Sequence, residues 1–174
     1  MKKKIYLAYG SNMDIAQMRQ RCPDAKIFGI GWLTGWRLMF KGSLTGSYAT
    51  IERGGKEAKV PLVVWKISEA DERALNRYEG FPAFYYKRTI KFDLKEQHTG
   101  ITRVSRGMAY VMHEYRDFGI PSKQYLDLLL NAYKTFGFQT QLLLEAWSYS
   151  KDASRKNIVN SGSLDEKREV YINY

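Results

Sequence analysis

The chain has 174 residues and a formal charge of +10 at pH 7, with 44% hydrophobic and 14% aromatic residues. This composition excludes a disordered chain, and the length predicts one domain built around a single core. The only cysteine, Cys22, excludes an intramolecular disulfide, and no apolar run is long enough for a transmembrane helix.

The basic charge is the feature of the composition that points to nucleic acids. The lysines and arginines are scattered, however, and the longest run is formed by residues 2–4. The apolar stretch after that run stops at Gly10, so it is too short for a signal peptide. We therefore expect a cytoplasmic protein that binds neither membranes nor nucleic acid. A monomer and a homodimer both remain open, and a basic nucleic-acid-associated protein is the less favoured alternative.

The first predicted element is a buried strand over residues 5–9, where apolar side chains alternate. Gly10 then permits a close backbone approach, and Ser11, Asn12 and Asp14 are residues that favour the start of a helix. Several backbone N–H groups should therefore converge on one place, which suits a carboxylate, a phosphate or a developing oxyanion. A plain strand–turn–helix connection fits the same residues.

The rest of the chain alternates between strands and helices. The sequence predicts one curved strand over residues 25–40 with bends at Gly29, Gly31 and Gly35. Ser68 and Asp71 form a capping box that opens a helix ending near Tyr78. Further strands are predicted at 47–53, 60–67, 84–94 and 102–113, and further helices at 14–22, 122–137 and around 142–147. Residues 150–174 form a polar extension to a domain of residues 1–149, expected to dock on that domain or on a partner subunit.

Glu79 is the last charged residue of the predicted helix, and Gly80 followed by Pro82 ends that helix. A glutamate at this end faces the negative pole of the helix dipole, and aromatic neighbours raise its pKa further. A pKa shifted in this direction suits a general base. The competing interpretation is an exposed glutamate at a helix end.

Six segments occur in an order that resembles the γ-glutamylcyclotransferase family, which includes the avirulence-induced-gene-like proteins. The resemblance spans roughly residues 4–147, and its most specific parts are the Tyr-Gly-Ser-Asn turn and the Glu-Gly turn. The matching segments are Ala8-Tyr-Gly-Ser-Asn-Met13, Ala49-Thr-Ile51, Val63-Val-Trp-Lys66, Tyr78-Glu-Gly80, Tyr85-Tyr86 and Pro121-Ser-Lys-Gln-Tyr125.

The resemblance implies an α+β fold, a small mixed β-barrel flanked by helices, whereas periodicity alone leaves an open sheet equally plausible. It also implies an enzyme that cyclises a small γ-glutamyl substrate to 5-oxoproline and releases an amine or amino acid. Glu79 would be the catalytic acid and base. The substrate would be bound by Tyr9, Gly10, Ser11, Asn12, Tyr86 and Tyr125, with Tyr85 as the alternative to Tyr86.

No cofactor and no metal ion are expected, because the chain has only two histidines, one cysteine and no phosphate-binding loop. The residues after Gly80 are closer to the avirulence-induced-gene-like branch, so the identity of the leaving group does not carry over. A non-catalytic domain that binds an anionic ligand at the same turn remains an alternative.

Overall fold

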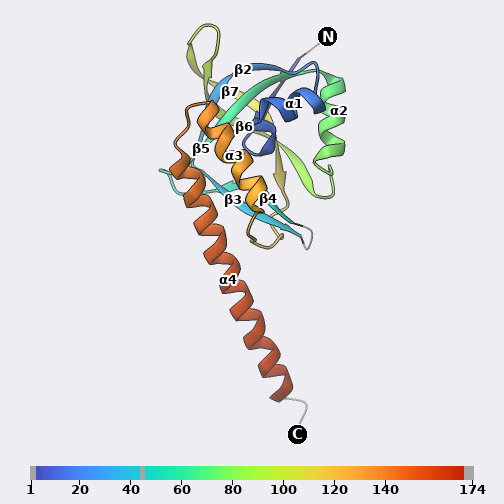
Figure 1. The fold of residues 1–174 in the computed structure, drawn as a ribbon, viewed down its shortest axis with the longest axis vertical. Helices are drawn as coiled ribbons and strands as arrows, with labels where there is room; N and C mark the ends of the chain where they lie inside the picture. Colours follow the sequence, from blue (N-terminus) through green and yellow to red (C-terminus); the bar gives the residue numbers. More distant parts are fainter. Residues whose placement is uncertain (1–2, 44–45, 171–174) are drawn as a thin grey trace.

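The computed structural model describes residues 3–43 and 46–170, with side chains described except for residues 43 and 158–170. Five strands close into a barrel in the order β1–β5–β2–β6–β7, and β3 and β4 form a separate hairpin (Figure 1). The strands are β1 Lys4–Ala8, β2 Lys26–Thr34, β3 Trp36–Ser43, β4 Gly46–Arg53, β5 Lys59–Ile67, β6 Tyr85–Glu96 and β7 Thr102–Met112. The helices are η1 Ser11–Met13, α1 Ile15–Arg21, α2 Glu69–Tyr78, α3 Lys123–Thr135 and α4 Thr140–Val170. The predicted α+β class and mixed barrel with flanking helices are confirmed.

Strand β1 closes the barrel between β5 and β7. It pairs antiparallel with β5, from Lys4 opposite Ile67 to Ala8 opposite Val63. Its pairing with β7 is the parallel one that makes the barrel mixed. Because β1 ends at Ala8, the turn that follows it lies at one end of the barrel, where η1 begins.

The predicted single strand over residues 25–40 is instead two strands, β2 and β3. The break falls at Gly35, whose φ of +77° lies in a region that side-chain-bearing residues rarely adopt. This turn sends β3 out of the barrel to pair with β4. The predicted bend at Gly29 is present, because the register of β2 against β5 shifts between Ile27 and Gly29.

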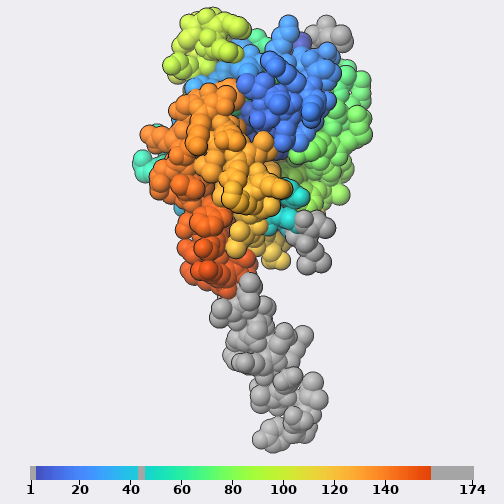
Figure 2. All heavy atoms as spheres, in the orientation of Figure 1, coloured from blue at the N-terminus to red at the C-terminus, as the bar shows by residue number. Residues whose placement is uncertain are grey.

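Helices α1, α2 and α3 cover one face of the molecule, as Figure 2 shows in blue, green and orange. The amphipathic pattern of α3 buries Leu129, Ala132 and Tyr133. In α4, Leu143 and Ala146 are buried, and this helix packs against β3. Within the described residues, no helix is both long and apolar enough to cross a membrane.

Helix α4 runs without a break through the predicted boundary between residues 149 and 150. Ser150 is fully buried, and its hydroxyl donates to the Ala146 carbonyl at 2.8 Å and accepts the Phe40 amide at 2.8 Å. Residue 150, the first residue of the predicted extension, therefore packs against β3 of the domain. The expected docking of the chain end concerns residues 170–174, whose side chains lie outside the described part.

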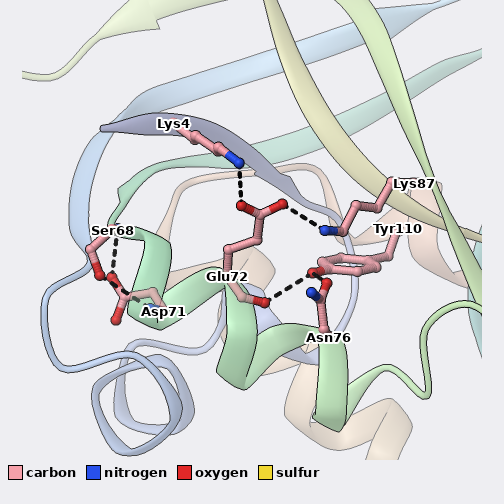
Figure 3. Close-up of polar contacts among 7 residues, drawn as sticks. All are labelled: Lys4, Ser68, Asp71, Glu72, Asn76, Lys87 and Tyr110. Atoms are coloured by element: carbon pink, nitrogen blue, oxygen red, sulfur yellow. Dashed lines mark hydrogen bonds and ion pairs between the residues drawn. The ribbon is translucent and has the colours of Figure 1, made fainter. Parts of the chain in front are cut away.

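Helix α2 is fixed to the barrel by charges, as Figure 3 shows. The predicted capping box is present, with Ser68 and Asp71 exchanging side-chain and backbone hydrogen bonds. Glu72, one turn after Ser68, forms ion pairs with Lys4 of β1 and with Lys87 of β6, the latter at 2.6 Å. These pairs lower the pKa of Glu72 against the opposing effect of its burial, so they favour its charged form.

A third strand contacts the following turn of α2. The Tyr110 hydroxyl of β7 donates to Asn76 Oδ1 at 2.6 Å (Figure 3), and Leu75 beside it is fully buried. Helix α2 is thus attached to β1, β6 and β7 before it ends. These attachments determine where the residue after the helix, Glu79, is placed.

We expect Gly29→Ala to destabilise the fold, because a Cβ at this bulge would lie 2.2 Å from the Lys95 carbonyl oxygen. The strand has to shift to relieve that contact, which should lower the free energy of unfolding by about 1–3 kcal/mol. Gly55→Ala is the control, since a Cβ there meets nothing within 4 Å. Urea denaturation of both variants measures the difference, and equal stabilities would contradict the close approach.

Candidate active site

Glu79 and the turn after β1 meet at one end of the barrel. Glu79 caps the C-terminus of α2, and Gly80, with a φ of +62°, turns the chain away. Asn12 Nδ2 donates to Glu79 Oε1 at 2.7 Å. Residues 67 positions apart in the sequence are therefore in direct contact.

Hydrogen bonds engage both the nitrogen and the oxygen of the Asn12 side-chain amide. It is buried, and its Nδ2 also donates to the Tyr6 hydroxyl at 2.8 Å. Its Oδ1 accepts from Arg21 Nη1 at 2.6 Å, and its backbone carbonyl accepts from Trp65 Nε1 at 3.1 Å. With both ends of the amide engaged, Asn12 presents a fixed donor to the Glu79 carboxylate.

Burial raises the pKa of Glu79 to about 7, while the charge of Arg21 and the hydrogen bond from Asn12 act in the opposite direction. The expectation of a raised pKa from the sequence agrees in direction, and desolvation of the carboxylate is the main cause. Near neutral pH the carboxylate therefore exists in both protonation states. Such a group can both accept and donate a proton.

Two adjoining hollows meet at Glu79. The inner chamber has a volume of about 30 Å³, room for about two water-sized groups, and the outer cleft has a volume of about 410 Å³. The residues shared by both hollows are Ser11, Glu79, Tyr85 and Tyr125. Glu79 thus stands where a molecule in the cleft would extend its polar end into the chamber.

The inner chamber is lined by phenols that stay neutral. Burial raises the pKa of Tyr6 and of Tyr9 well above the usual range, and the negative charge of Glu79 adds to both shifts. The Tyr9 hydroxyl donates to the Tyr110 carbonyl, and the Tyr125 hydroxyl accepts from the Ala49 amide at 3.2 Å. These contacts fix the walls of the chamber without adding charge.

The backbone of the turn faces the same chamber. Met13 N donates to the Gly10 carbonyl at 2.9 Å, which starts the short helix η1. The amides of Gly10 and Asn12 have no acceptor among the described residues, and both residues line the chamber. A Cβ on Gly10 would lie 3.2 Å from the Tyr125 hydroxyl, so a side chain there would enter the chamber.

Most of the residues predicted from the sequence are brought together here. The lining of the inner chamber includes Tyr9, Gly10, Ser11, Asn12, Glu79 and Tyr125. Among the described residues, no group of three or more histidine, cysteine, aspartate or glutamate side chains is arranged to hold a metal ion.

Tyr86 is the exception, because its side chain lies outside both hollows. Its hydroxyl donates to Glu114, and its ring packs against His113. Tyr85 lines the chamber instead, and its hydroxyl donates to the Ala49 carbonyl at 2.9 Å. Successive side chains of a strand point to opposite faces, so only one of the two tyrosines can face the site.

Several residues of the site were not predicted, and three of them lie close to Asn12 and Glu79. Tyr6 and Tyr110 line the chamber, and Arg21 supplies the charge beside Asn12. The alternation of β1 could have identified Tyr6, because it lies on the opposite face from Leu7. Arg21 gave no signal, since it reaches the site by folding back from the end of α1, where its guanidinium lies 3.6 Å from the centre of the Tyr78 ring.

Residues 6–127 match the family model described as "Gamma-glutamyl cyclotransferase, AIG2-like". The chain belongs to this family. The match includes both the turn at Gly10 and the helix end at Glu79. None of the curated proteins matches the sequence.

Solved structures of the family share the fold. One titled "Gamma-glutamyl cyclotransferase" is 25% identical, with a TM-score of 0.67 over 86% of this chain and 87% of the other. An uncharacterized protein from Homo sapiens is 26% identical, with a TM-score of 0.70 over 87% and 88%. A yeast γ-glutamyl cyclotransferase titled as specific to glutathione is 12% identical, with a TM-score of 0.58 over 89% and 95%, and shows the common fold.

The raised pKa of Glu79 predicts a pH dependence of stability. The folded pKa of about 7 exceeds the ordinary value of 4.5, so the stability present below pH 4.5 is lost as pH rises through 7. Glu79→Gln should remove this loss and gain up to about 3 kcal/mol over wild type at pH 8. Glu57→Gln, at an exposed glutamate, is the control. Denaturation at pH 5 and pH 8 measures the effect, and an unchanged pH slope would show that the carboxylate is solvated.

Proposed function

We propose that this protein cyclises γ-glutamyl amides, releasing 5-oxoproline and an amine or amino acid. The observation that carries the proposal is the Glu79 carboxylate, with a pKa of about 7, where the cleft meets the chamber. Membership of the family supports the same reaction class. The substrate would be a small molecule whose polar end enters the chamber.

The reaction takes place within one substrate molecule. The free α-amine attacks its own γ-carbonyl carbon, a C–N bond forms, and a five-membered lactam results. The bond from that carbon to the leaving nitrogen breaks. The α-nitrogen loses two protons as the ammonium becomes the lactam N–H, and the leaving nitrogen gains two as it becomes the ammonium of the product. Since nucleophile and electrophile are already joined, correct orientation can provide an effective molarity of about 10⁵ M or more. The proposed reaction requires no cofactor.

Glu79 would carry both proton transfers. In its charged form it accepts a proton from the α-ammonium, and in its protonated form it donates to the leaving nitrogen. A pKa near 7 makes both steps accessible at neutral pH. The fixed hydrogen bond from Asn12 holds the carboxylate in one orientation through the cycle.

The turn would bind the negative charges of the substrate. The amides of Gly10, Ser11 and Asn12, residues that line the chamber, would hold either the α-carboxylate or the oxygen of the γ-carbonyl as it gains charge. Tyr9 and Tyr125 would close the sides of the chamber as neutral phenols. Tyr85 takes the place on the wall that was expected for Tyr86.

Glu79→Gln should lower kcat by about 10²–10⁴-fold and change substrate affinity little, because glutamine keeps the shape but cannot accept the proton. Release of 5-oxoproline from a panel of γ-glutamyl peptides and amines measures this. The wild-type rate should also rise with pH through about 7, since the base must be deprotonated. Glu57→Gln serves as the control, and a fully active Glu79→Gln protein would rule out the assignment.

Gly10→Val should abolish turnover while the barrel stays folded. The added side chain would start 3.2 Å from the Tyr125 hydroxyl and would fill the small chamber. Gly10→Ala adds less volume, so we expect an intermediate rate. Circular dichroism and thermal unfolding report on the fold, and 5-oxoproline release reports on the site. Retention of both rate and affinity in the valine variant would exclude the turn as the anion site.

A further inference from the structure

The outer cleft is lined mainly by aromatic rings. The aromatic residues among its lining are Tyr48, Tyr78, Phe84, Tyr85 and Tyr125. Tyr48 packs edge-to-face on Tyr125 with ring centres 5.5 Å apart, and on Phe84 with centres 6.4 Å apart. These three packed rings belong to β4 (Tyr48), to α3 (Tyr125) and to the segment before β6 (Phe84). One wall of the cleft is therefore built from three separate parts of the chain.

Two of these rings remain open to solvent. The exposed fraction is 38% for Tyr48 and 47% for Tyr78. Exposed aromatic surface that borders a concave site is typical of a ligand-binding surface. The guanidinium carbon of Arg21 lies 3.6 Å from the centre of the Tyr78 ring and holds that ring in place. The Phe84 ring is likewise held, with the guanidinium carbon of Arg116 4.1 Å from its centre. The cleft therefore presents aromatic rings that neighbouring side chains hold in place.

Within the described part of the chain, the lining of the outer cleft contains one cationic and one acidic side chain. Arg77 is the cation in the lining, and Glu79 is the acid. Arg77 is exposed and forms no ion pair within the part of the chain that the structure describes. A carboxylate on the ligand would be attracted to this guanidinium, whereas an ammonium group would be repelled.

We propose that the outer cleft is the site of the leaving group, and that its preferred substrates are γ-glutamyl amides of aromatic amino acids. The aromatic side chain would pack against Tyr48 and Phe84, and the carboxylate of the same amino acid would pair with Arg77. The inference rests on the proposed cyclisation, because only that reaction defines a leaving group. The assignment of the cleft to the leaving group follows from the position of Glu79 between the chamber and the cleft. There Glu79 would protonate the nitrogen that joins the γ-glutamyl group to the leaving group.

A panel of γ-glutamyl substrates separates the contributions of ring and carboxylate. It contains the amides of phenylalanine, phenethylamine, alanine and ethylamine, together with the 1,4-diaminobutane amide as a cationic case. We expect the highest kcat/KM for phenylalanine, about tenfold lower values without the ring, and about three- to tenfold lower values without the carboxylate. The cationic amide should be the poorest substrate.

Arg77→Ala tests the charge. It should reduce kcat/KM for the phenylalanine amide to the level of the phenethylamine amide, and change the latter by less than twofold. Arg77→Lys should retain part of the difference. The matched control is Arg73→Ala, one turn earlier on α2, exposed and outside the cleft lining. It should leave every ratio in the panel unchanged.

Equal kcat/KM values across the panel, or a preference for the cationic amide, would overturn the proposal while leaving the cyclisation intact. Absence of 5-oxoproline from every substrate would overturn the proposed reaction instead. In that case, calorimetric titration of the γ-glutamyl phenylalanine probe into wild type and Arg77→Ala decides on the cleft. Binding that depends on Arg77 supports the outer cleft as a site for an aromatic amino acid. Absence of binding rules that site out.

Discussion

The hydrogen bond between Asn12 and Glu79 is the contact on which the rest of the site depends. It joins the turn after the first strand to the end of α2, and each partner is supported by its own set of contacts. Asn12 is fixed by Tyr6, Trp65 and Arg21, while α2 is attached to three barrel strands through Glu72 and Asn76. The barrel acts as the common frame that aligns a backbone turn with a carboxylate.

The same contact explains why this carboxylate can be kept in a costly environment. Burial disfavours the charge of Glu79, and Arg21 and Asn12 offset only part of that effect. A second acid on the same helix, Glu72, is treated in the opposite way, because two lysines favour its charged form. One helix thus carries a glutamate whose charged form is favoured by ion pairs and, two turns later, a glutamate whose charged form is disfavoured by burial.

The sequence was most informative where local chemistry determines geometry. The Tyr-Gly-Ser-Asn turn, the capping box at Ser68 and the helix end at Glu79 were all predicted, because each depends on neighbouring residues. Long-range geometry was less accessible. The orientation of Tyr85 against Tyr86 depends on the exact register of β6, and the reach of Arg21 depends on how α1 packs. The direction of the chain after Gly35 was missed because a run of β-forming residues does not reveal which sheet each half joins.

Ser150 of α4 is fully buried against the strand β3. Its hydroxyl accepts the hydrogen bond of the Phe40 amide, at the centre of β3. A chain cut at residue 149, where composition suggests an appendage, would leave a buried strand amide without its acceptor. Loss of the extension would therefore destabilise the hairpin of β3 and β4. This hairpin supplies Ala49 and Tyr48 to the site. The polar segment therefore begins as a structural element of the domain, beside the hairpin that borders the candidate site.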